Sequence, residues 1–289
     1  MKAGPVYVSS SCFSFRGLAE LLNDCEKNNF YNIELGCSFN YHRNYFSILK
    51  KYPKFNFLIH NYFPPPKDSF VLNLSSANRE ILKKSINQCK KAMDLCAEFG
   101  VPFFSVHAGF LADLKPGDLG ANKKIDISQY IDRESGLSIF KNSIEILLAY
   151  GSRREVGLLI ENNVVNKANL VNGKNESCLM VEKEEILTFM ELFDSRYLGL
   201  LVDVGHLNVT ANLLNFNRFD FLKDLGRYIR AFHLSANNGI QDQHLPFGKN
   251  EWFLPILQQE EFKKIPKILE FNKSVLTVEI LNCMKMIKV

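Results

Sequence analysis

Residues 156–163, VGLLIENN, and residues 199–206, GLLVDVGH, follow one pattern: a short, almost wholly apolar run that ends in a carboxylate. Such a run, bounded by polar residues, is typical of a strand buried on both faces of a parallel sheet. Similar runs alternate with amphipathic stretches along the whole chain, which predicts repeated strand–helix units. Eight strands are predicted, at Pro5–Ser9, Tyr31–Gly36, Lys54–His60, Pro102–His107, Val156–Glu161, Gly199–Asp203, Ile229–Leu234 and Ser274–Ile280.

The clearest helix is predicted at Asn78–Phe99, where apolar residues recur at helical spacing. Gly100 is placed to end this helix, and Ser75 and Ser76 are candidates to cap its start. Further helices are predicted at Ile131–Tyr150, Lys183–Phe193 and Phe219–Gly226.

Eight strand–helix units in 289 residues favour an α/β fold of the (β/α)8 TIM barrel type. The alternative, an open doubly wound sheet, normally carries a glycine-rich phosphate loop after its first strand, and this chain has SSSCFSFRG there. Nine residues follow Ile280, so the last helix is expected to be abbreviated.

The composition is that of an ordinary globular protein, with 46% apolar and 23% charged residues and a net charge of +4. This small excess is not the concentrated basic footprint of a nucleic-acid-binding protein. Seven cysteines without a CxxC pair predict reduced thiols and a cytoplasmic location. No linker divides the chain, so residues 1–289 are expected to form a single domain, and no apolar run predicts export or a membrane partner.

Residues of metal-ligand type stand at the ends of the predicted strands. They are His60, His107, Glu161, Asp203 with His206, His233, and Glu279, while Asp242 and His244 lie in the loop after the His233 strand. The carboxyl ends of parallel barrel strands converge on one rim, so these side chains are expected to meet although they are scattered in sequence. Imidazole together with carboxylate suits a borderline divalent ion, so the sequence predicts a site for Zn²⁺, Mn²⁺, Co²⁺ or Fe²⁺.

Several of these segments resemble the xylose isomerase-like TIM barrels, which include sugar-phosphate isomerases and epimerases and the endonuclease IV type of abasic-site nucleases. VDVGH and DQHLPFGKNEW are similar to the D-x-x-H and D-x-H-x-x-x-G segments of that family, and HNYFPPPKDSFVLNLSS and SVHAG resemble its nuclease branch. The resemblance implies a shared metal site at Glu161, Asp203, His233 and Glu279. Nuclease-type sites add five further ligands, which would be His60, His107, His206, Asp242 and His244.

The chain departs from the nuclease pattern at two segments. The nuclease branch usually opens with a His-Val-Ser segment and follows its His233-type residue with Leu-Asn-Asp, whereas this chain has YVSSSCFS and HLSANNG. Glu34 is common in the sugar-isomerase relatives, and the resemblance implies that it binds a hydroxyl of the substrate. Charges in the predicted rim loops nearly balance, with Lys115 and Lys174, for example, offset by Asp113 and Glu176.

These indications favour a divalent-metal-dependent isomerase or epimerase of a sugar or sugar phosphate, in which Glu161 and Glu279 transfer a proton next to a carbonyl. The alternative is a zinc-dependent endonuclease that cleaves DNA at abasic sites. A further alternative is a non-catalytic, metal-containing barrel that binds a sugar. One to three ions of zinc, manganese or cobalt are expected.

Overall fold

The computed structural model describes residues 3–15, 17–36, 39–118, 130–272 and 275–287, and its eight strands form a closed parallel barrel. Each strand pairs with the next along the chain, and β8 pairs with β1 to close the ring. The strands are β1 (Val6–Ser9), β2 (Asn32–Leu35), β3 (Asn56–His60), β4 (Phe103–His107), β5 (Gly157–Glu161), β6 (Leu198–Asp203), β7 (Ile229–Leu234) and β8 (Lys267–Leu269). This confirms the predicted TIM barrel and excludes the open sheet.

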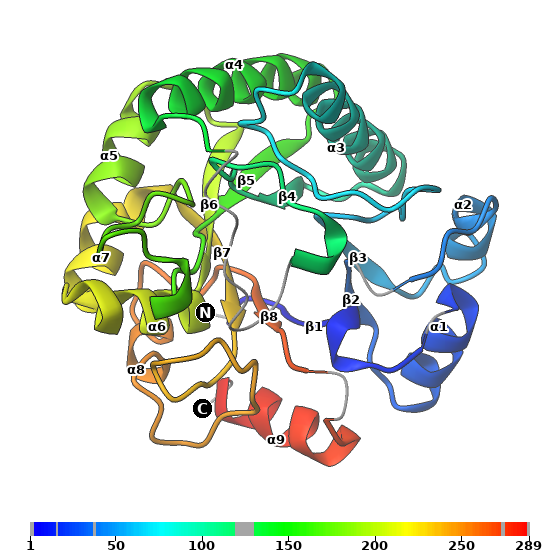
Figure 1. Ribbon diagram of the computed structural model, residues 1–289. Helices are drawn as coiled ribbons and strands as arrows, with labels where there is room; N and C mark the ends of the chain where they lie inside the picture. Colours follow the sequence, from blue (N-terminus) through cyan, green and yellow to red (C-terminus); the bar gives the residue numbers. More distant parts are fainter. Residues whose placement is uncertain (1–2, 16, 37–38, 119–129, 273–274, 288–289) are drawn as a thin grey trace.

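The helices surround the barrel, whose strands occupy the middle of Figure 1. They are α1 (Leu18–Lys27), α2 (Tyr45–Leu49), α3 (Arg79–Phe99), α4 (Arg133–Ser152), α5 (Lys183–Glu191), α6 (Val204–Leu214), α7 (Arg218–Leu225), α8 (Leu254–Leu257) and α9 (Thr277–Ile287). Single 3₁₀ turns follow at η1 (Ser10–Cys12), η2 (Pro116–Asp118), η4 (Lys167–Asn169) and η5 (Gly226–Tyr228).

Helix α3 is bounded by residues that suit its two ends. Gly100 ends it in the left-handed conformation, with φ of 65°, as predicted. The N-cap is Asn78, whose side chain accepts hydrogen bonds from the backbone of the first turn, so the predicted caps at Ser75 and Ser76 are wrong. Ser76 instead accepts a hydrogen bond from the Asn78 backbone amide and donates one to Asp113.

The eighth strand lies earlier in the chain than the sequence predicts. Strand β8 is Lys267–Leu269, whereas the predicted strand Ser274–Ile280 is wrong, because its described part leads into and begins α9. A short β-branched run such as VLTV cannot be told from the first turn of a helix by periodicity alone. As a result α9 supplies an 11-residue closing helix instead of an abbreviated one, and Glu270 follows the last strand.

The barrel is apolar through its middle and polar at the carboxyl ends of its strands. Ile33, Leu58, Phe104 and Phe232 belong to one continuous buried core. At the carboxyl ends this core gives way to buried carboxylates and imidazoles, which form the site described below. The six cysteines in the described part of the chain are free and buried. None of the described helices has the length and apolar character to cross a membrane.

Candidate metal centre

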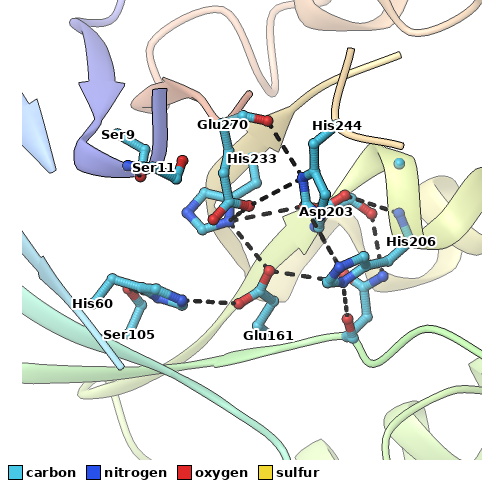
Figure 2. Close-up of polar contacts among 12 residues, drawn as sticks. Ser9, Ser11, His60, Ser105, Glu161, Asp203, His206, His233, His244 and Glu270 are labelled. Carbon is cyan, nitrogen blue, oxygen red and sulfur yellow. Dashed lines mark hydrogen bonds and ion pairs between the residues drawn. The ribbon is translucent and has the colours of Figure 1, made fainter. Parts of the chain in front are cut away.

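Strand pairing brings the predicted strand-end residues to one level of the barrel. His60, His107, Glu161 and Asp203 are the last residues of β3, β4, β5 and β6. His107 pairs with Glu161 in register, and Asp203 pairs with His233 of β7. Figure 2 shows the side chains of His60, Glu161, Asp203 and His233 pointing toward one another. The predicted convergence on one rim is confirmed for these residues.

The remaining members of the site come from the segments that follow the strands. Asp203 caps α6 by accepting a hydrogen bond of 2.8 Å from the backbone amide of His206, which sets that histidine in the first helical turn beside it. The loop after β7 carries Asp242 and His244, and backbone hydrogen bonds of 2.8 and 2.9 Å between Ala236 and Leu245 close it. Glu270 enters directly after β8.

Three carboxylates surround one nitrogen of His233. Its Nδ1 lies 3.1 Å from Glu161 Oε1, 3.1 Å from Glu270 Oε2 and 3.9 Å from Asp203 Oδ2. The four residues each offer a ligand atom, and these atoms lie within 4.8 Å of one another. This is a donor set suited to a divalent ion.

Glu161 also faces a second group through its other oxygen. Glu161 Oε2 lies 3.5 Å from His60 Nε2 and 3.4 Å from His107 Nδ1. The two oxygens of one fully buried carboxylate are therefore directed at two different sets of ligand atoms. Glu161 therefore contributes a ligand atom to each of two groups.

A third group is formed by His206, Asp242 and His244. Asp242 Oδ2 lies 3.2 Å from His206 Nε2 and 2.7 Å from His244 Nε2. The predicted residues thus fall into three adjoining groups, with Glu270 in the place expected for Glu279.

Several buried carboxylate oxygens of the site have no hydrogen-bond partner among the described residues. They are Glu34 Oε2, Glu161 Oε2, Asp203 Oδ2 and Asp242 Oδ1. A buried polar atom without a partner is costly, and a buried charge more so, unless a cation compensates it. Glu161, Asp203 and Asp242 also belong to groups with metal-ligand geometry, so the residues present fit divalent ions.

Burial and mutual charge shift the protonation of the site in opposite directions. Burial lowers the pKa of His107 to about 4 and raises the pKa of Asp203 to about 6. For His233, burial also disfavours the charged form, but the carboxylates around it, Glu34 foremost, outweigh this and raise its pKa well above the usual value. Protons on such imidazoles compensate the carboxylates when no metal is bound, so metal binding would release them.

The last two predicted site residues, Glu279 and Glu34, lie in different surroundings. Glu279 is in the first turn of α9, and its Oε2 accepts a hydrogen bond of 2.8 Å from the Leu276 backbone amide. It is not part of the cluster, so its predicted place beside Glu161 is wrong. Glu34 is fully buried at the end of β2, where its Oε1 lies 3.0 Å from His233 Nε2.

Sequence reasoning missed Glu270 because its strand has only three residues. The signal was nonetheless present, since KILE repeats in brief the apolar run and terminal carboxylate of LLIE and LLVD. The longer β-branched run at residues 274–280 resembles a strand more strongly than KIL does.

A TIM barrel that gathers imidazoles and carboxylates at its carboxyl rim defines the class of this protein. The chain belongs to the xylose isomerase-like TIM barrel family, whose model matches residues 20–285. It is 26% identical over 189 residues to an uncharacterized protein of Methanocaldococcus jannaschii, MJ1311, covering 65% of this chain and 56% of that protein.

Two further proteins are similar to this chain, one in sequence and one in fold. A probable endonuclease 4 of Aquifex aeolicus is 25% identical over 220 residues, covering 71% of this chain and 68% of that protein. The crystal structure of a D-tagatose 3-epimerase-like protein superimposes with a TM-score of 0.71 at 20% identity, covering 99% of this chain and 98% of that chain. Members of the family are enzymes of both kinds, and the second likeness is one of fold.

Proposed function

We propose that this protein hydrolyses a phosphate ester by means of a centre of several divalent ions. The observation that carries the proposal is the position of Glu161, whose two oxygens face two separate ligand groups, with the third group adjoining them. Centres of two ions are typical of phosphatases, polymerases and nucleases, where they stabilise the attacking and leaving oxygens of the displacement.

The proposed ligands follow the three groups. His60, His107 and Glu161 would hold one ion; Glu161, Asp203, His233 and Glu270 a second; and His206, Asp242 and His244 a third. Bound ions of this kind polarise a phosphate ester and activate water as a nucleophile. The chain keeps the groups in fixed relation, because Asp203 both belongs to the second group and caps the helix that carries His206.

Abasic-site DNA is the first substrate to test, because the Aquifex aeolicus relative bears the name of an endonuclease. The segments after β1 and β7, which depart from the nuclease pattern, favour testing small phosphate esters beside it. Hydrolysis of either substrate breaks a phosphate-ester bond, so cleavage of abasic-site DNA or of a small phosphate ester would support the proposal.

A sugar isomerase or epimerase is the second candidate. It is favoured by Glu161 and Glu270, which place oxygens at equal distances of 3.1 Å from His233 Nδ1 and so offer two carboxylates at one ligand group. Two such groups can serve as base and acid on either side of a carbon next to a carbonyl. In this mechanism Glu270 takes the part that the sequence assigned to Glu279, and the D-tagatose 3-epimerase-like neighbour supports it at the level of fold.

Asp242→Ala separates the two candidates. The substitution removes the residue between His206 and His244 and leaves the Glu161–Asp203–His233–Glu270 group intact. Zinc-loaded protein is incubated with an abasic-site duplex, with small phosphate esters, and with ketoses and sugar phosphates in D₂O. We expect phosphate-ester cleavage by the wild type that falls at least tenfold in Asp242→Ala.

The matched control is Asp94→Ala, which removes an exposed carboxylate bonded to Tyr150 and Arg154, outside the site. It should cleave like the wild type. Deuterium entering a sugar at equal rates in the wild type and Asp242→Ala, without cleavage of any ester, would overturn the proposal in favour of the isomerase.

A further inference from the structure

Glu34 is a fully buried carboxylate that lies beside the three ligand groups without being needed to complete any of them. It lies in β2, where it pairs with Ser9 of β1 and Leu58 of β3. Its Oε1 lies 3.0 Å from His233 Nε2, and its Oε2 has no hydrogen-bond partner among the described residues. Burying this charge is expensive, and an apolar residue would pack here at lower cost.

The two nitrogens of His233 face different surroundings. Nε2 faces Glu34, while Nδ1 faces Glu161 and Glu270 at 3.1 Å each. A neutral imidazole carries a proton on one of its two ring nitrogens, and only the nitrogen without that proton can bind a metal. A carboxylate at Nε2 holds the proton there and leaves the lone pair on Nδ1 directed at the metal group.

Glu34 and His60 are also close enough to be counted with His233 as a ligand set. His60, however, has both ring nitrogens engaged elsewhere, with Nδ1 3.1 Å from Ser105 Oγ and Nε2 3.5 Å from Glu161 Oε2. Among the described residues, the contact with His233 then remains for Glu34. The geometry therefore favours an action on His233 over direct binding of an ion.

We propose that Glu34 is a positioning residue that fixes His233 as a metal ligand by accepting a hydrogen bond from its Nε2–H. This inference rests on the metal centre of the proposed function. Within that centre it gives Glu34 a role different from contact with a substrate hydroxyl. The imidazole is held in one tautomer and one ring orientation, and the negative charge of Glu34 makes Nδ1 a stronger donor.

The test measures binding of Zn²⁺ alone, by chelator competition, to metal-stripped wild type and variants. Glu34→Ala should lower the zinc affinity of the His233 group by about 10- to 100-fold, which is the usual effect of removing the hydrogen-bond partner of a metal-binding histidine. Glu34→Gln keeps an acceptor for the Nε2 proton but loses the charge, so its loss should be smaller. If Glu34→Ala fails to fold, Glu34→Gln against the wild type decides, and unchanged zinc affinity in it would then overturn the inference.

Leu58→Ala is the matched control, because Leu58 is Glu34's register partner on β3 and is also buried. It removes buried side-chain volume next to Glu34 without changing any residue of the three ligand groups, so zinc affinity should stay at the wild-type value while thermal stability falls. Glu34→Ala that binds zinc as tightly as Leu58→Ala would overturn the inference.

The tautomer of His233 is a second readout, obtained from long-range ¹H–¹⁵N spectra of the zinc-loaded protein. We expect the proton on Nε2 in the wild type and Glu34→Gln, and a proton on Nδ1 in either would contradict the proposal. Neither readout depends on turnover. If Glu34→Ala loses zinc affinity but the wild type cleaves no phosphate ester, the role of Glu34 is upheld and the proposed function is refuted. If the wild type cleaves a phosphate ester but Glu34→Ala keeps its zinc affinity, the proposed function is upheld and the role of Glu34 is refuted.

Discussion

Replacing Glu270 by Gln should damage the metal centre, whereas the same replacement at Glu279 should leave it intact. Glu270 Oε2 lies 3.1 Å from His233 Nδ1 and is one of four side chains in that group. A structural zinc site contributes about 10–16 kcal/mol, so an even share among four ligands is about 3 kcal/mol. At about 1.4 kcal/mol per tenfold change, Glu270→Gln should weaken that ion by about 100-fold.

In the described part of the chain, the Glu279 side chain accepts a hydrogen bond from the Leu276 backbone amide at the start of α9. A glutamine can still accept that hydrogen bond, so Glu279→Gln should cost well under about 1 kcal/mol of stability and leave zinc affinity unchanged. Zinc affinity is measured by chelator competition and stability by urea unfolding. Equal zinc affinity of Glu270→Gln and wild type, or a large loss in Glu279→Gln, would refute the placement of Glu270 in the metal group.

Three further outcomes are expected from the fold and the buried site. Gly205→Ala would place a Cβ 2.7 Å from Ser235 Oγ and 3.1 Å from Asp203 Oδ1, so it should lower both zinc affinity and thermal stability; a fall in stability alone would contradict this. Asn78→Ala should cost about 0.5–2 kcal/mol in urea unfolding, because α3 loses its cap, and zinc content should not change. Burial lowers the pKa of Lys267 to about 8, whereas the ordinary value is about 10.4. Between pH 8 and about pH 10.4 the unfolded chain therefore binds more protons than the folded chain. Wild-type stability should therefore rise with pH in that window relative to Lys267→Met, and a constant difference between the two would argue against a displaced pKa.

The fold could be predicted because most strands carry their signal locally. Strand β7 has the predicted bounds, Ile229–Leu234, and Glu161 and Asp203 stand out because each ends a long apolar run. Glu270 was hidden behind a run of three residues, KIL, which is too short for periodicity to identify. The stronger β-branched pattern next to it belongs to a helix.

The sequence could not predict which side chains of the cluster contact one another. Glu34 and His233 are 199 residues apart in sequence, and their contact depends on how β2 and β7 face each other across the closed barrel. A strand-end position predicts that a side chain reaches the rim, but not which nitrogen of a histidine it meets. The family resemblance implied a substrate contact for Glu34, and no strand-end pattern could predict its contact with His233.

The central claim, that three ligand groups hold three ions, is tested most directly by the metal content of the protein. Zinc-loaded wild type and Asp242→Ala are freed of excess metal and measured by elemental analysis. We expect about three zinc ions per chain in the wild type, one for each group that shares or adjoins Glu161, and about two in Asp242→Ala. A single ion per chain that is unaffected by Asp242→Ala would contradict the account.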